Sequence, residues 1–137
     1  MKSTFVFFLV LLQNAIGAFA QGSDTFNVCF DRNSAKLNIK GSERIDELIA
    51  DSSIIRGQKL ILFGYADYLG TNSHNDSLSI SRAKNVAEQL IRKGINKKDI
   101  TLCVGKGKID RTPVGKDGYS SDRKVQIITA KKAKKDH

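Results

Sequence analysis

The sequence has little of several residue types that mark particular protein classes. There is no tryptophan, one proline and two histidines among 137 residues. Two histidines at no familiar ligand spacing argue against the common zinc sites, and a single proline argues against a proline-rich linker. Beyond the N-terminus, no apolar run reaches the roughly 20 residues of a transmembrane helix. Acidic residues are also few, 14 against 23 basic ones, so the chain is strongly basic.

The N-terminus has the three parts of a secretory signal peptide. Lys2 supplies a positive charge, and residues 5–12 form an unbroken apolar run. Ala18 and Ala20 then give the small side chains that a signal peptidase needs at −3 and −1. We expect cleavage after Ala20, with an uncleaved membrane anchor as the alternative. Gln21 follows, so the new N-terminus offers no thiol for lipidation.

Export and charge together narrow the partner classes. With residues 1–20 removed as a signal peptide, residues 21–130 suffice for one domain, and residues 131–137 form a basic tail that we expect to be disordered. A basic chain can bind nucleic acid, an anionic membrane or an anionic cell-wall polymer. Export argues against nucleic acid as a partner.

Hydrophobic patterning predicts four strands and two main helices in the order β-α-β-α-β-β. The predicted strands are 26–30, 59–65, 100–104 and 124–129. The first predicted helix includes residues 45–49, and residues 105–121 are predicted to form a long loop. The continuous apolar run 60–63 favours burial of the second strand on both faces and a central position in the sheet. Strands linked by helices favour an α/β two-layer sandwich with right-handed crossovers.

The second helix has recognisable ends. Ser73 and Asp76 resemble a capping box, and Gly94 fits the position just past the last turn, with the helix ending at Lys93. The apolar stripe of this helix is predicted to consist of Ile80, Ala83, Ala87, Leu90 and Ile91.

The most informative segments are residues 64–70 and 75–86. They resemble the signature of the C-terminal domain family of outer membrane protein A, in outline G-H-T-D-x-x-G and then N-x-x-L-S-x-x-R-A-x-x-V. Both glycines, the Asp, the Asn, Leu-Ser, Arg-Ala and Val match, and Asp67 precedes Arg82 by the family's fifteen positions. The resemblance covers about residues 26–129, and so long a spaced pattern is specific.

The same residues suit a zwitterionic ligand on physical grounds. Asn75, Ser79 and Arg82 follow one another at i, i+4 and i+7, which makes a polar stripe on one helix face. The first helical turn favours a carboxylate, and the planar fork of Arg82 can hold a second one. Asp67 leaves the carboxyl end of a central strand, where open α/β sheets place ligands. Its charge suits an ammonium group.

The resemblance implies a function and a sheet order. Relatives bind peptidoglycan non-covalently through the diaminopimelate of its peptide stem, without a cofactor, in the periplasm of Gram-negative bacteria in association with the cell wall or outer membrane. Their mixed four-stranded sheet has the order 1-4-2-3 with strand 4 antiparallel, which would bring Arg123 and Asn33 to the rim beside Asp67. The residues carried over as ligand-binding are Asn33, Asp67, Asn75, Arg82 and Arg123.

Three departures from the family pattern bear on this site. Ala66 removes the hydroxyl of the usual Thr, and Tyr65 stands where His is common. Asp122 replaces the Asn before Arg123, and its negative charge is placed to compete for that arginine. These departures predict weaker binding or an altered preference.

Other readings of the sequence stay open. Asp67 and Arg82 can form a purely structural ion pair. The chain can be an adaptor that has lost ligand binding and meets outer-membrane or envelope proteins, or a polyanion binder led by the lysine tail. Enzymatic arrangements are less well supported, because residues 105–108 lack the spacing of a phosphate loop, and no Ser-His-Asp, Cys-His or metal-ligand order is recognisable. We predict a non-enzymatic module with no metal and no cofactor.

The two cysteines give a separate test of the strand order. An oxidising compartment favours a disulfide, yet Cys29 and Cys103 belong to the first and third strands, which the family's order places at opposite sheet edges. Three strand spacings amount to about 14 Å, whereas a disulfide needs Cα atoms within about 7 Å. We therefore expect no bond between them. Their alternation within the strands predicts two buried thiols on one face of the sheet.

Overall fold

The fold is an α/β sandwich of one sheet and one helical layer. The computed structural model describes residues 17–113 and 115–131, so most of the predicted signal peptide and all of the tail after Lys131 lie outside the described residues. The elements are β1 (Ser23–Cys29), α2 (Ile39–Ala50), β2 (Leu60–Ala66), α3 (Asn72–Arg92), β3 (Ile100–Lys108) and β4 (Lys124–Ala130), with short 3₁₀ turns η1 (Lys97–Asp99) and η2 (Ser120–Asp122).

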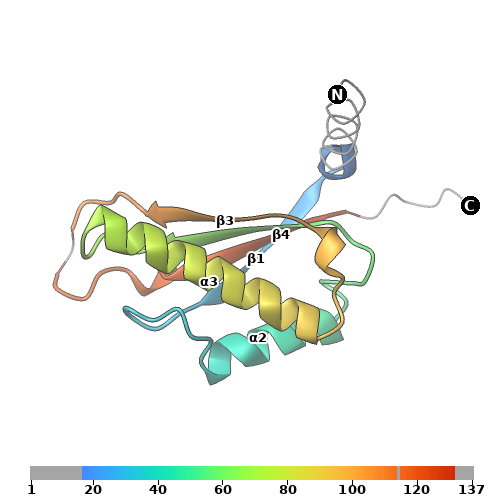
Figure 1. The fold of residues 1–137 in the computed structure, drawn as a ribbon, viewed down its shortest axis with the longest axis horizontal. Coiled ribbons are helices and arrows are strands. Elements are labelled where there is room, and N and C mark those ends of the chain that lie inside the picture. Colours follow the sequence, from blue (N-terminus) through green and yellow to red (C-terminus); the bar gives the residue numbers. More distant parts are fainter. Residues whose placement is uncertain (1–16, 114, 132–137) are drawn as a thin grey trace, which may run out of the picture.

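The sheet has the order β1-β4-β2-β3, which confirms the predicted topology. β2 pairs with β3 in parallel, and β4 runs antiparallel to both β1 and β2. Figure 1 shows α2 and α3 in one layer beside the sheet. This arrangement places the end of β2, the beginning of β4 and the beginning of α3 at the same end of the molecule.

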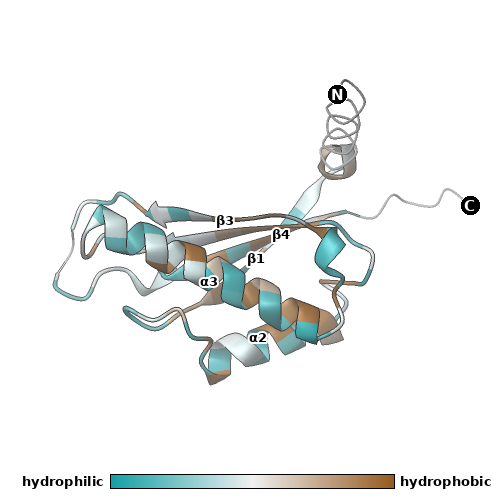
Figure 2. Cartoon of the chain, viewed as in Figure 1, coloured by the Kyte–Doolittle hydropathy of each residue, from teal (hydrophilic) through white to brown (hydrophobic). Residues whose placement is uncertain are grey.

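The core lies between the sheet and the two helices. Its buried members come from every main element except β3: Val28, Phe30, Ile45, Leu48, Ile54, Leu60, Leu62, Val86, Leu90, Ile95, Val125 and Ile127. β2 is central, as predicted, but its residues alternate between buried and half-buried, so one face is packed on the helices and the other is only partly covered. Figure 2 shows hydrophobic residues on the strands and between α2 and α3.

The N-cap of helix α3 lies two residues before Ser73, the predicted start of the capping box. This N-cap is Thr71, whose Oγ1 accepts a hydrogen bond from the backbone N–H of His74 at 3.2 Å. The predicted C-terminal signal is confirmed, because Gly94 has a φ of +102° and donates to the carbonyl of Ile91. Ile95 donates to the carbonyl of Leu90 and is buried, the pattern of a Schellman motif.

The predicted apolar stripe of α3 is confirmed at its two alanines and at Leu90, but not at its two isoleucines. Ile80 and Ile91 are 41% and 37% exposed, and the fully buried positions include the polar Ser79 and Arg82. The sheet explains this shift. Gly64 of β2 approaches the backbone of α3 so closely that a Cβ there would overlap the carbonyl oxygen of Ser79. The helix therefore turns its polar stripe, not the isoleucines, toward the end of the sheet.

Strand β3 is longer than predicted and is irregular at its start. It continues to Lys108, so the strand takes up the beginning of the predicted loop 105–121. A register shift opposite Leu60 and Ile61 reverses the alternation after Ile100. Cys103 consequently packs against the core, whereas Leu102 is 43% exposed.

The cysteines are unbonded, as predicted, but they do not share a face. Both thiols are free. Cys29 is exposed opposite Lys124 of β4, and Cys103 is half-buried on the core side. The prediction that both are small buried hydrophobes is therefore wrong for Cys29. Within the described residues, no helix is long and apolar enough to cross a membrane.

Candidate functional site

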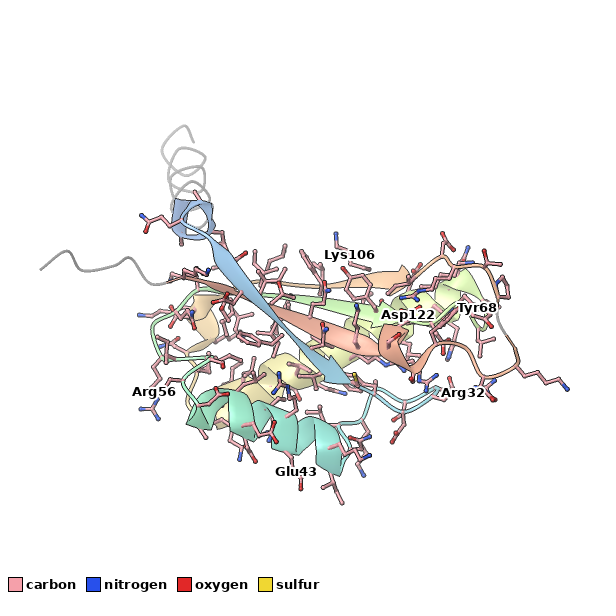
Figure 3. The ribbon with its side chains drawn as sticks, turned by 180° about the vertical axis from the view of Figure 1, so that it is seen from behind. Arg32, Glu43, Arg56, Tyr68, Lys106 and Asp122 are labelled. Atoms are coloured by element: carbon pink, nitrogen blue, oxygen red, sulfur yellow. The ribbon has the colours of Figure 1, made fainter. Side chains whose placement is uncertain are left out.

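A small polar cavity lies where the end of β2 meets the start of α3. Its volume is about 210 Å³. Figure 3 places Arg32, Tyr68 and Asp122 at this end of the molecule, away from Arg56. All five residues predicted to bind ligand line the cavity. The complete lining is Arg32, Asn33, Asp67, Leu69, Gly70, His74, Asn75, Leu78, Arg82 and Arg123.

The central feature of the cavity is an ion pair between Asp67 and Arg123. Arg123 Nη1 lies 3.1 Å from Asp67 Oδ2, and the two side chains are only 15% and 8% exposed. The sheet produces this contact, because β4 runs antiparallel to β2 and the residue preceding β4 meets the residue following β2. The convergence expected from the strand order is confirmed. Arg123 is further held by the carbonyl oxygens of Phe30 and Asp117.

Asn75 fixes the loop that carries Asp67. Its Nδ2 donates to the carbonyl of Leu69 at 2.8 Å and to that of Asp67 at 3.4 Å. Asp67 Oδ1 in turn accepts the backbone N–H of Leu69 at 3.2 Å. Asn75 is 2% exposed, so the role of its amide is to stabilise the conformation of the loop. Polar side chains that satisfy backbone groups in this way keep a buried carboxylate in one orientation.

Arg82 is the most deeply buried member of the site. The residue is 0% exposed, and its guanidinium donates to three backbone carbonyls, those of Ser34 at 2.8 Å, Tyr65 at 2.9 Å and Asp31 at 3.1 Å. These contacts join the loop after β1 to the end of β2 across α3. The guanidinium of Arg82 was predicted to hold a ligand carboxylate, but each of its nitrogens already donates to a carbonyl of the protein.

The charge of Arg82 persists despite its burial. Burial lowers its pKa to about 10, an effect that the charge of Asp67 opposes and that of Arg123 reinforces. A pKa near 10 leaves the group protonated at neutral pH. Its Cζ also lies 5.4 Å from the centre of the Phe30 ring, where a cation–π contact adds to the hydrogen bonds. The floor of the cavity is thus positively charged.

Asn33 and His74 close the rim. Asn33 has a φ of +52°, a left-handed conformation that Asn tolerates better than most residues. Its Oδ1 lies 2.6 Å from His74 Nε2, which links the loop after β1 to the first turn of α3. No role was assigned to His74 from the sequence. Nothing in its sequence neighbourhood indicates a partner 41 positions away.

Asp122 does not compete for Arg123, contrary to the sequence-based expectation. It is fully buried and pairs with Arg111, whose Nη2 lies 2.7 Å from Asp122 Oδ1. Arg111 also stacks over the ring of Tyr119, 4.6 Å from its centre. Sequence reasoning missed this pair because Arg111 lies within a long loop that carries no periodic signal.

The other two departures from the family pattern also point away from the cavity. Ala66 is fully buried in the sheet. The Tyr65 ring lies on the opposite face, beneath Lys124 Nζ at 5.6 Å. Neither lines the cavity, so the charged lining stands independently of these replacements.

Comparisons with known proteins agree with this fold. Residues 29–126 match the model of the OmpA family. Outer membrane protein A of Serratia marcescens is 31% identical over 74% of this chain and 29% of its own length, so this chain spans under a third of that relative. The OmpA-like domain of FopA1 from Francisella tularensis superposes with a TM-score of 0.61 at 25% identity, covering 77% of this chain and 71% of that domain.

A further solved structure has the same fold at lower identity. The peptidoglycan-associated lipoprotein from Burkholderia pseudomallei superposes with a TM-score of 0.58 at 20% identity, covering 75% of this chain and 88% of that one. The family match begins at the last residue of β1 and ends within β4, and it includes β2, β3, both main helices and all five predicted site residues. This chain therefore belongs to the OmpA family.

Proposed function

We propose that this chain binds peptidoglycan non-covalently through the diaminopimelate of its peptide stem. The observation that carries the proposal is the Asp67–Arg123 ion pair, nearly desolvated, in the wall of a small polar cavity. Diaminopimelate ends in an ammonium and a carboxylate on one carbon. A cavity that presents one carboxylate and one guanidinium side by side is complementary to that end.

Binding would exchange an internal ion pair for two ligand contacts. The ligand ammonium would approach Asp67, and the ligand carboxylate would accept hydrogen bonds from Arg123. Arg82 adds a fixed positive charge to the cavity without having to move, because three carbonyls already hold it. Asn75 keeps the Asp67 loop in shape. A preorganised site of this kind loses little entropy when the ligand binds.

Family membership supports the same proposal. Domains of the OmpA-like family commonly bind peptidoglycan, and one structural neighbour is named as peptidoglycan-associated. A periplasmic location of the chain, at the wall or the outer membrane of a Gram-negative cell, follows from the proposal and from the predicted signal peptide. Attachment to the wall, rather than catalysis, is then the role of the module.

Sedimentation with purified sacculi tests the proposal. We expect the wild-type protein to sediment with diaminopimelate-type sacculi and the Asp67→Asn variant to remain in the supernatant. Removing one member of a desolvated charged contact typically costs about 2–5 kcal/mol of binding free energy. The matched control is Asp46→Asn on α2. This substitution is equally conservative and removes one charge from the exposed ion pair between Asp46 and Lys93. Circular dichroism checks that both variants are folded.

The rival functions give different outcomes. An adaptor that has lost ligand binding would not sediment with sacculi in any form. A polyanion binder led by the lysine tail would sediment equally with and without the Asp67 substitution, and would be released by salt because exposed charges are screened. Equal sedimentation of wild type and Asp67→Asn would overturn the proposed site.

A further inference from the structure

The cavity around Asp67 is too small for a peptide stem. Its volume of about 210 Å³ is below the range of about 300–1,000 Å³ that holds most organic ligands. It has room for one end of diaminopimelate, so the neighbouring stem residues must lie on an adjacent surface. This step rests on the proposed function.

A larger groove adjoins the cavity. Its volume is about 610 Å³, and it lies between the end of β1, the first turns of α2 and η2. Arg123 lines both spaces. Its Nε contacts the carbonyl of Phe30, a groove residue, while its Nη1 contacts Asp67 in the cavity. A ligand bound at Asp67 therefore needs to pass only one side chain to enter the groove.

The groove carries positive charge at its α2 wall. Lys40 and Arg44 both line it, one helical turn apart. The only ion pair of Arg44 among the described residues is with Glu47, at 3.4 Å and largely exposed, and such pairs are weak and readily exchanged. Across residues 17–113 and 115–131, Lys40 forms no ion pair. Asp31 is the single acidic residue of the lining, and it already accepts a hydrogen bond from Asn38.

We propose that this groove is a second subsite, which holds the part of the stem that precedes diaminopimelate. In that part, glutamate is linked through its γ-carboxyl and keeps a free α-carboxylate. Lys40 and Arg44 would bind this carboxylate, at the N-terminal end of α2 where the helix dipole also favours an anion. The mixed lining of the groove, with Cys29 and Phe30 among its members, suits the short apolar side chain of the alanine that comes before it.

Cys29 makes the groove directly testable in the native protein. It lines the groove and is exposed, whereas Cys103 lies on the core side of the sheet and serves as an internal reference. The rate of Cys29 alkylation by N-ethylmaleimide, measured by peptide mass mapping, reports whether the groove is covered. Saturating L-Ala-γ-D-Glu-diaminopimelate should slow this rate at least about fivefold. Free diaminopimelate, which fills only the cavity, should leave it unchanged.

A charge reversal gives the second readout. The Lys40→Glu, Arg44→Glu variant should bind the tripeptide at least about tenfold more weakly than wild type in titration calorimetry. A Lys97→Glu, Lys98→Glu variant of η1, at the opposite end of the sheet, is the matched control and should bind normally. The groove assignment is overturned if the tripeptide binds but leaves Cys29 unprotected, or if free diaminopimelate protects it equally. A tripeptide that does not bind at all refutes the proposed function instead.

Discussion

Replacing Arg82 should damage the fold before it reveals anything about the ligand. The guanidinium donates to three backbone carbonyls and the residue is fully buried. Hydrogen bonds from charged groups contribute about 1.5–3 kcal/mol each. The sum is reduced because water can enter the vacated space, so we expect Arg82→Ala to lower the free energy of unfolding by about 3–5 kcal/mol. That is a large share of the roughly 5–15 kcal/mol that stabilises a typical domain.

Urea denaturation followed by far-ultraviolet circular dichroism measures this loss, since the chain has no tryptophan to report by fluorescence. With a slope of about 1.5–2 kcal/mol per molar, the unfolding midpoint should fall by roughly 1.5–3 M. The unfolding midpoint of Arg82→Lys should lie between those of the wild type and Arg82→Ala, because an ammonium can reach fewer of the carbonyls.

A control on the same helix separates burial from charge. Arg92 pairs with Glu88 at 3.8 Å, with both side chains more than 60% exposed. Arg92→Ala should therefore change stability by less than about 0.5 kcal/mol. If Arg82→Ala shifts the urea midpoint no further than Arg92→Ala does, the carbonyl contacts contribute nothing measurable, and the structural role assigned to Arg82 is refuted.

Two further predictions concern the sheet. Gly64→Ala should destabilise the protein by about 1–3 kcal/mol or more, because its Cβ would overlap the Ser79 carbonyl of α3. Gly57→Ala has open space around it and should cost only the backbone strain of about 1–2 kcal/mol. Thermal denaturation that finds Gly57→Ala the less stable variant would contradict the close approach of α3 to β2. Under native, non-reducing conditions at pH 8, maleimide should label Cys29 well before Cys103, since burial raises the pKa of Cys103 and so lowers its thiolate fraction. Equal labelling rates would contradict the difference in burial of the two thiols, and the absence of any reactive thiol would indicate a disulfide and contradict the strand order.

Sequence reasoning reached the strand order and the site rim for an identifiable reason. The order came from the family resemblance. Once β4 lies antiparallel beside β2, Arg123, which precedes β4, must lie next to Asp67, which follows β2. The alternation of β3 was lost because one irregular pairing near Ile100 reverses the parity of every later residue. No residue pattern in the strand marks that irregularity.

The burial of Arg82 was also beyond the sequence. Its helical spacing from Asn75 was read correctly, but periodicity places a residue on a face without saying how close the next layer lies. Gly64 decides that distance, because the missing side chain lets α3 approach β2. The polar stripe is thereby sealed into the interior, where Arg82 must satisfy backbone carbonyls as well as any ligand.

Recognition of diaminopimelate is the central claim, and one comparison tests it most directly. Titration calorimetry of the wild-type protein would measure the dissociation constants of two tripeptides that differ only in the third residue, diaminopimelate or lysine. Lysine keeps an ammonium at the end of its side chain but lacks the carboxylate that Arg123 is positioned to bind. Loss of one hydrogen-bonded charged contact predicts an affinity at least about tenfold lower for the lysine peptide. Equal affinities for the two peptides would contradict the assignment.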